Sequence, residues 1–244
     1  MNAIVVGASA GLGRALSEAL AARGHDLVLV AQDARDVDAQ AAWLRLKYSI
    51  RVVSVAADAA DLERLLAALR DATSGMTQIH GLYFPAGFTF ENDRGTLGVP
   101  ETRRLLDVNL TSVMVAVADL MPRMLACGPA NIVGFGSIAS IRGRNANVVY
   151  AAAKRALASY FESLRHRCAG SDVRVQFYQL GYLDTQQTFG RKLLFPPASP
   201  ERVARYVMNN LNHDKGNIFL PRYWTVIAAI LSLLPWSIYK KLQF

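Results

Sequence analysis

The sequence predicts a doubly wound α/β fold in a single domain, with a mostly parallel sheet and an apolar helical tail at the C-terminus. Three observations support this prediction. Short apolar runs alternate with helical patterns over residues 2–180. The runs are continuously apolar, as strands are when helices cover both faces of a parallel sheet. A glycine-rich turn joins the first run to the first helical pattern.

The elements follow one another at short intervals. Strands are expected at Asn2–Val6, Asp26–Ala31, Arg51–Ala56, Gly81–Phe84, Ala130–Phe135 and Val173–Leu180, where the runs are apolar and often β-branched. Helices are expected at Leu12–Arg23, which Gly24 ends, and at Val37–Tyr48, Leu62–Ala72, Arg103–Leu125 and Val148–Arg167. This alternation is typical of a sheet that binds ligands beyond the carboxyl ends of its strands.

The alternation stops after Leu180. Residues 181–200 form a long irregular stretch, which is typical of a lid or a binding loop. Ser199 is expected to cap a further helix that has Pro200 at its first position. Asn217–Leu220 suits a last short strand before an apolar tail.

Composition excludes several classes of protein. The 244 residues are 52% hydrophobic and 19% charged, which predicts a globular chain with a sizeable core. The net charge is +8 (27 basic minus 19 acidic), but the arginines are scattered, so nucleic acid is not an expected partner. Cys127 and Cys168 are too few for a disulfide framework, and the four histidines are dispersed. We expect no metal site, no signal peptide and a reduced, cytoplasmic setting.

The turn Gly7-Ala8-Ser9-Ala10-Gly11-Leu12-Gly13 predicts a dinucleotide site. Gly7 permits the tight turn, and Gly11 lets backbone N–H groups approach a pyrophosphate at the helix N-terminus. Gly13 lets the helix pack close to the sheet. Cofactor contacts are expected from Gly7, Ser9, Ala10, Gly11, Leu12 and Gly13. Asp58, after the third strand, is either an acceptor for the adenine amino group or a simple strand-end or helix-capping aspartate.

Ser137, Tyr150 and Lys154 suit proton transfer to a substrate oxygen. Ser137 follows the fifth strand, and Tyr150 opens the helix that carries Lys154 one turn later, so both side chains share a helix face. An unperturbed tyrosine has a pKa of about 10 and is a poor proton shuttle near neutrality. A fixed ammonium beside the phenol is expected to lower the pKa of Tyr150.

Together these residues resemble the short-chain dehydrogenase/reductase family over residues 1–220, which implies a Rossmann-type fold and NAD(P)-dependent hydride transfer. The resemblance implies that Ser137, Tyr150 and Lys154 are catalytic, and that Asn109 completes a tetrad by holding a water that relays protons to the lysine. Ala86, Gly87, Gly181 and Thr185 match further cofactor contacts, as do Tyr150 and Lys154 themselves. Val6, Phe84-Pro85 and Leu180 depart from the family's pattern and put local hydrogen bonding in doubt.

The end of the second strand bears on the choice of cofactor. An acidic residue at the position of Ala31 binds ribose hydroxyls and excludes a phosphate, and none is present. Gln32 stands where NADP-users often have arginine, although Arg14 or Arg35 is placed to reach a 2′-phosphate. Cofactor contacts are therefore expected from Gln32, Asp33 and Arg35, and NADP(H) is favoured over NAD(H).

The tail, 221–244, has no charged face. Val226, Ile227, Ile230, Leu231 and Leu234 form one helical stripe, with aromatic residues at both ends and Lys240-Lys241 closing the segment. A helix without a charged face is covered on most sides by something. Either residues 223–241 lie in a membrane interface, on the inner face of the cell membrane, or they pack on their own domain or across a homo-oligomer. The first alternative favours a hydrophobic or lipid-linked substrate: a polyprenyl-phosphate sugar, a sphingoid ketone or a similar ketone.

Two other functions stay open. One is a soluble ketoacyl reductase of acyl-carrier-protein thioesters, which requires a basic patch at the mouth of the site and a tail that avoids lipid. The other is a protein that binds NAD(P) as a sensor without turnover, although a sensor has no need of Ser137, Tyr150 and Lys154 together.

Overall fold

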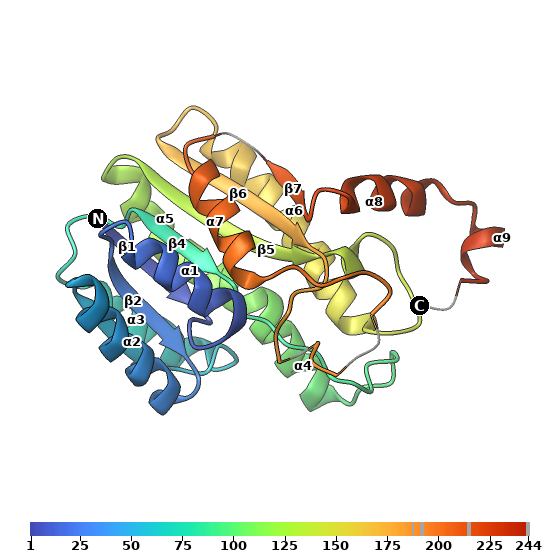
Figure 1. Ribbon diagram of the computed structural model, residues 1–244, viewed down its shortest axis with the longest axis horizontal. Coiled ribbons are helices and arrows are strands. Elements are labelled where there is room, and N and C mark those ends of the chain that lie inside the picture. The colour runs from blue at the N-terminus through green and yellow to red at the C-terminus, as the bar shows by residue number, and fades with distance from the viewer. Residues whose placement is uncertain (187, 191–192, 214–215, 243–244) are drawn as a thin grey trace.

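The computed structural model describes residues 1–186, 188–190, 193–213 and 216–242. Its centre is one parallel sheet whose strand order is β3-β2-β1-β4-β5-β6-β7 (Figure 1). The strands are β1 (Asn2–Val6), β2 (Asp26–Ala31), β3 (Val52–Ala56), β4 (Gly81–Phe84), β5 (Ala130–Ser137), β6 (Val173–Leu180) and β7 (Asn217–Leu220). This arrangement confirms the predicted doubly wound, Rossmann-type fold, and the short strand at Asn217–Leu220 is its seventh member.

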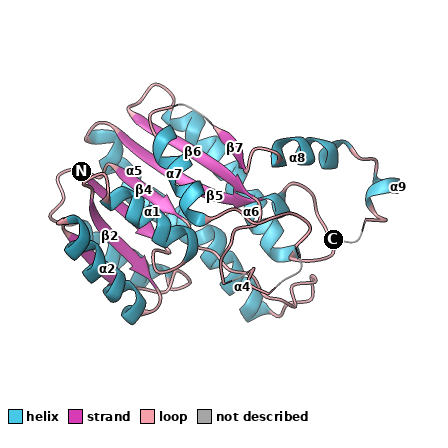
Figure 2. Cartoon of the chain, viewed as in Figure 1, coloured by secondary structure: helices cyan, strands magenta, loops and turns pink. Residues whose placement is uncertain are grey.

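Helices cover both faces of the sheet (Figure 2). The helices of one face are α1 (Gly11–Ala21), α2 (Ala34–Tyr48) and α7 (Pro200–Asn210), and those of the other are α3 (Leu62–Thr73), α5 (Ser112–Ala126) and α6 (Val148–Cys168). Alternate side chains of β1 belong to the two cores, Ala3 and Val5 to one, Ile4 and Val6 to the other, and all four are buried. Because both faces are covered, the strands lack the polar alternation of a half-exposed sheet.

The helix predicted at Arg103–Leu125 is longer and less regular than expected. A continuous helical run comprises α4 (Val99–Leu106), a π-helical segment η1 (Asp107–Thr111) and α5. Pro100 stands in the first turn of α4, where a missing N–H costs nothing. The run is long and apolar enough by composition to cross a membrane, but its apolar residues, Val113, Val117 and Leu120 among them, pack into the core against the sheet.

The direction of winding reverses between β1 and β4, which are neighbours in the sheet. In open sheets of this kind the ligand crevice lies beyond the carboxyl ends of the strands at such a switch point. Gly7 follows β1 and Ala86 follows β4, and Ala86 N donates to Val6 O at 3.0 Å. The two connections that the glycine motif and the family resemblance single out are therefore in direct contact.

The tail forms α8 (Trp224–Leu233) and α9 (Trp236–Tyr239), which extend away from the sheet (Figure 1). Trp224 and Ala228 face the domain and are buried, whereas Val226 and Ile230 are 63% and 55% exposed. Within the predicted apolar stripe, Val226 and Ile230 lie open and Ile227, Leu231 and Leu234 are partly buried, so the fully buried residues of α8 lie outside the stripe. The first turn of the tail is fixed to the domain, and much of its apolar surface lies open.

Arg142 ties the tail to the segment 138–147, which links β5 to α6. Its Nη1 donates to the carbonyl oxygens of Leu231 (2.6 Å) and Leu234 (2.5 Å), at the C-terminal end of α8. Its guanidinium also lies 4.0 Å from the centroid of the Tyr239 ring, a cation–π contact. A helix C-terminus carries partial negative charge, so this position suits an arginine.

Candidate active site

The glycine turn between β1 and α1 leaves no room for side chains. Gly7 has a φ of +94°, and a Cβ there would lie 2.6 Å from Ala86 N. A Cβ on Gly13 would lie 1.8 Å from Gly7 O, so only glycine lets α1 pack this close to the turn. Gly11, at φ +47°, faces Thr185, whose Cγ2 would lie 3.0 Å from its Cβ. The roles predicted for Gly7 and Gly13 follow from these contacts.

This turn suits the pyrophosphate of a dinucleotide. No side chain caps the N-terminus of α1 at Ala10, so its first amides have no internal acceptor. Arg14 Nε and Nη2 donate to Ser9 O at 3.1 and 2.7 Å and hold the loop in shape. Leu12 is buried in the core, so only its backbone can contact a ligand. A glycine cradle, open amides and the positive end of a helix are what an anionic diphosphate requires.

The ends of β2 and β3 carry the residues predicted to contact the adenosine half. Gln32 is exposed, and Asp33 caps α2 by accepting from the amides of Arg35 (2.9 Å) and Asp36 (3.4 Å). The Arg35 side chain is 92% exposed and lies 3.3 Å from an Asp33 oxygen.

Asp58 has two protein partners in the structure. It accepts from Ala60 N at 2.9 Å through Oδ1 and from Arg104 Nη1 at 2.9 Å through Oδ2. This geometry is that of a strand-end aspartate that closes a turn after β3 and is held by an ion pair, whereas the cap of α3 is Asp61.

Gly87, Asn109 and Lys154 converge behind the crevice. A Cβ on Gly87 would lie 2.8 Å from Asn109 Oδ1 and 3.2 Å from Lys154 Nζ. Lys154 is 4% exposed, and its Nζ donates to Phe135 O at 3.2 Å. Only glycine at position 87 leaves room for the Asn109 amide and the Lys154 ammonium this close to the end of β4.

The π-helical segment explains how Asn109 enters the site. Asn109 Nδ2 donates to Leu105 O and to Phe88 O, both at 2.9 Å. Its Oδ1 is buried and has no partner among the described residues. A buried acceptor without a donor is costly, and a water or ligand donor beside Lys154 satisfies it.

Ser137 and Tyr150 lie on the open side of the same group. Ser137 ends β5, and its Oγ accepts from Ala139 N at 3.2 Å. Burial raises the pKa of Tyr150, against the opposing effects of Ser137 and the Arg144 charge. Burial also lowers the pKa of Lys154 to about 8.

The expectation that Lys154 lowers the pKa of Tyr150 is therefore wrong in this geometry. Lys154 Nζ lies 5.9 Å from the centroid of the Tyr150 ring, and burial of the phenol outweighs the charges around it. The Lys154 ammonium donates to the carbonyl of Phe135 and lies with Asn109 Oδ1 beside Gly87, although its place one turn after Tyr150 predicts a position beside the phenol.

Sequence reasoning missed Asp93, which fixes the start of α6. Asp93 is 1% exposed, and its two carboxylate oxygens accept from Val149 N (3.1 Å) and Tyr150 N (3.0 Å). A carboxylate at this place satisfies open amides and suits the helix dipole. Because the partners are 56 and 57 positions apart, no local pattern announces the contact.

Gly181 and Thr185 lie where β6 enters the irregular stretch. A Cβ on Gly181 would lie 2.0 Å from Trp224 Nε1, so the first turn of the tail packs directly on this connection. Thr185 lies over Gly11 of the cofactor turn.

Among the residues that the structure describes, no group of three or more His, Cys, Asp or Glu side chains is placed to hold a metal ion.

Known proteins share this sequence and fold. Residues 1–192 match the family described as short chain dehydrogenase. An uncharacterized oxidoreductase of Mycobacterium tuberculosis is 27% identical over 243 residues, which cover 98% of this chain and 96% of that protein. The 3-oxoacyl-(acyl-carrier-protein) reductase FabG of Escherichia coli is 30% identical over 186 residues, which cover 76% of this chain and 75% of that protein.

Solved structures agree with this assignment of the fold. A short-chain dehydrogenase from Sphingobium yanoikuyae in complex with NADPH has a TM-score of 0.83 at 23% identity, and the match covers 99% of this chain and 96% of that one. A 3-oxoacyl reductase from Brucella melitensis with bound NAD has a TM-score of 0.78 at 22% identity, covering 90% of this chain and 88% of that one. The chain therefore belongs to the short-chain dehydrogenase/reductase family of NAD(P)-dependent oxidoreductases.

Proposed function

We propose that this enzyme transfers a hydride between NADP(H) and a hydrophobic or lipid-linked ketone or secondary alcohol, with Ser137, Tyr150, Lys154 and Asn109 as its catalytic group. The observation that carries the proposal is the convergence of Asn109 Oδ1 and Lys154 Nζ on Gly87, at the switch point of the sheet. Ser137 stands at the carboxyl end of β5 and is among the groups that act on the Tyr150 phenol.

Each residue has a defined task. The nicotinamide cofactor, when bound, supplies or accepts the hydride. Ser137 Oγ holds the substrate oxygen, and Tyr150 Oη gives it a proton in reduction or takes one in oxidation. Since the pKa of Tyr150 is raised, the phenol starts protonated and is prepared for reduction. Lys154 and Asn109 Oδ1 supply a polar route that returns the proton to Tyr150.

Three features support NADP(H) over NAD(H). The position at the end of β2 is Ala31, so no carboxylate there repels a 2′-phosphate. Arg14 lies in the first turn of α1, directly after the cofactor turn, and Arg35 lies at the start of α2. The Sphingobium yanoikuyae neighbour was solved with NADPH, although the Brucella melitensis one holds NAD.

The exposed surface around the tail supports an apolar substrate and contact with a membrane surface. Leu233 and Trp236 are 83% and 66% exposed, and Lys240 and Lys241 follow them. Apolar side chains beside terminal lysines suit the boundary between lipid headgroups and acyl chains. A FabG-like reduction of carrier-protein thioesters makes no use of this surface.

Cofactor titration and turnover test the proposal. NADPH and NADH binding is measured by fluorescence, and ketone-dependent NADPH oxidation is followed for wild type, Tyr150→Phe and Tyr160→Phe, using ketones from short and polar to long and apolar. Tyr150→Phe is expected to lower turnover by roughly 10²- to 10⁴-fold, since it removes the proton donor. Nucleotide affinity is expected to stay unchanged.

Tyr160→Phe is the matched control, because it removes a phenolic hydroxyl from the same helix at a bond to Met114 O. It is expected to leave turnover at the wild-type level. Failure of both nucleotides to bind overturns the proposal. Nucleotide binding without turnover of any ketone points instead to a sensor.

A further inference from the structure

Arg144, which precedes Tyr150 by six residues, has no hydrogen-bond or ion-pair partner among the described residues. It belongs to the segment 138–147 between Ser137 and Tyr150. Its Nε is buried, and no described residue gives its guanidinium a hydrogen bond or an ion pair. A buried guanidinium N–H without an acceptor is costly, so structures retain one where a ligand supplies the acceptor.

The neighbouring arginines show that Arg144 is different. Arg142 donates to two carbonyl oxygens of α8, and Arg94 Nη1 donates to Asn145 O at 3.4 Å. The nearby carboxylate of Asp93 is occupied by the amides of Val149 and Tyr150. Carbonyl oxygens therefore accept from Arg94 and Arg142, and backbone amides donate to Asp93, but no described residue accepts from Arg144.

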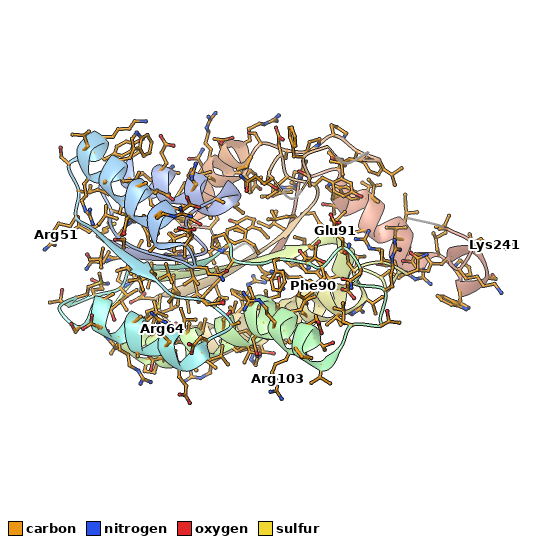
Figure 3. All side chains as sticks on the ribbon, turned by 90° about the horizontal axis from the view of Figure 1, so that it is seen from below. Arg51, Arg64, Phe90, Glu91, Arg103 and Lys241 are labelled. Atoms are coloured by element: carbon orange, nitrogen blue, oxygen red, sulfur yellow. The ribbon has the colours of Figure 1, made fainter. Side chains whose placement is uncertain are left out.

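Arg144 stands two residues after Arg142, which bonds the tail, and six residues before Tyr150. Its positive charge acts to lower the pKa of Tyr150 on one side and of Tyr239 in α9 on the other, although burial raises both. Figure 3 shows Phe90 and Glu91 on the loop after β4, and Lys241 at the outer end of the tail. A substrate oxygen at Tyr150 therefore has the Arg144 guanidinium nearby, and the exposed apolar side chains of α8 and α9 lie farther out.

We propose that Arg144 binds an oxyanion of the substrate, a phosphate or a carboxylate, which lies between the reacting carbonyl and an apolar chain that extends toward α8 and α9. A planar guanidinium presents paired N–H donors that match either group. The inference deepens the proposed function, because it rests on the same site and defines the class of substrate as an anionic, lipid-like ketone.

Binding of small anions tests this without turnover. Hexyl phosphate, hexanoate and hexanol share one apolar chain, and their affinities are measured by calorimetry with and without saturating NADP⁺, in wild type and in Tyr150→Phe. The wild type is expected to prefer one of the two anions to hexanol, and the preferred anion identifies phosphate or carboxylate. Arg144→Gln is expected to weaken that anion on the order of tenfold and to leave hexanol unchanged.

Two further variants exclude indirect effects. Arg64→Gln removes the same charge from an exposed position on α3 (Figure 3) and is expected to bind like wild type. Arg144→Lys keeps the charge without the paired donors and is expected to restore part of the affinity.

An absent preference for anions in wild type overturns the inference, and so does an equal preference in Arg144→Gln. If the protein binds neither nucleotide but still binds the anion through Arg144, the proposed function is refuted and the inference about Arg144 stands.

Discussion

Lys154 holds its charge where water does not reach it. Burial lowers the pKa of its amine to about 8, well below the usual 10.5, so the folded protein releases this proton more readily than the unfolded chain. Below pH 8 the buried charge costs stability, and that cost disappears as the pH rises toward 10.5. Keeping Lys154 charged in the folded protein therefore lowers the free energy of unfolding.

Lys154→Met should therefore stabilise the protein while it abolishes turnover. At pH 7 the gain is expected to be about 3 kcal/mol at most, from the shift of the pKa, and to shrink between pH 8 and 10.5. Urea denaturation across this range measures it.

Lys47→Met is the control. Its amine bonds Glu18, which raises the pKa of Lys47 above the usual 10.5, so its difference from wild type should stay constant from pH 7 to about 10. A stability difference for Lys154→Met that stays constant from pH 7 to 10.5 contradicts the prediction.

At the scale of an element, the start of α6 decides where the catalytic phenol lies. Asp93 holds the amides of Val149 and Tyr150, and Asn147 precedes the helix with a φ of +54°, its Oδ1 accepting from Thr89 Oγ1 at 3.0 Å. The first turn of α6 is therefore shaped by the loop after β4. The position of Tyr150 is therefore set by residues that do not contact the substrate.

Asp93→Ala should destabilise the protein by about 2 kcal/mol, because it leaves two amides without an acceptor. It should also lower kcat more than it changes KM, since Tyr150 loses its orientation. Asp93→Asn keeps an acceptor and should recover part of both losses.

Asp61→Ala provides the comparison. Asp61 caps α3 by accepting from Arg64 N at 3.2 Å, far from the phenol. Its loss should reduce the free energy of unfolding without changing kcat. An Asp93→Ala enzyme with wild-type kcat shows that α6 orients Tyr150 unaided.

How far the sequence predicts each element depends on the range of the forces that form it. Apolar strands, the Ser199 cap and the glycine turn are written in adjacent residues and were predictable; Ser199 Oγ accepts from Arg202 N at 3.2 Å, as expected. The π-helical segment at Asn109 was not, because it depends on a bond to Phe88 O, 21 positions away. The same holds for Asp93 and for the unpartnered Arg144, which only the folded chain reveals.

At the scale of the whole molecule, the tail adds an apolar surface to a compact sheet domain. Val226, Ile230, Leu233, Trp236 and Ile238 are all more than half exposed. Exposed apolar groups gathered on one projecting segment mark a contact with lipid or with another protein surface. The net charge of +8 and the lysines at the end of the tail favour an anionic lipid surface.

Ile230→Glu combined with Leu233→Glu tests that contact. Wild type should float with vesicles that contain anionic lipid, and the double variant should bind them at least about tenfold less, because two apolar side chains lose their burial. Leu46→Glu, which changes an 85% exposed leucine on α2, should bind like wild type.

Absence of vesicle binding by wild type contradicts the membrane contact. A change from dimer to monomer in the double variant, measured by sedimentation, then assigns the tail to a second copy of the chain.

The attachment of Arg142 to α8 has a consequence for biosynthesis. Its two acceptors, Leu231 and Leu234, stand 89 and 92 positions later in the chain. A chain leaving the ribosome from its N-terminus forms β1, β2 and the nucleotide turn long before α8 exists. The segment that carries Arg144 therefore gains this anchor only after a further 89 to 92 residues have been made, so the glycine turn emerges well before the segment next to Tyr150 is held in place.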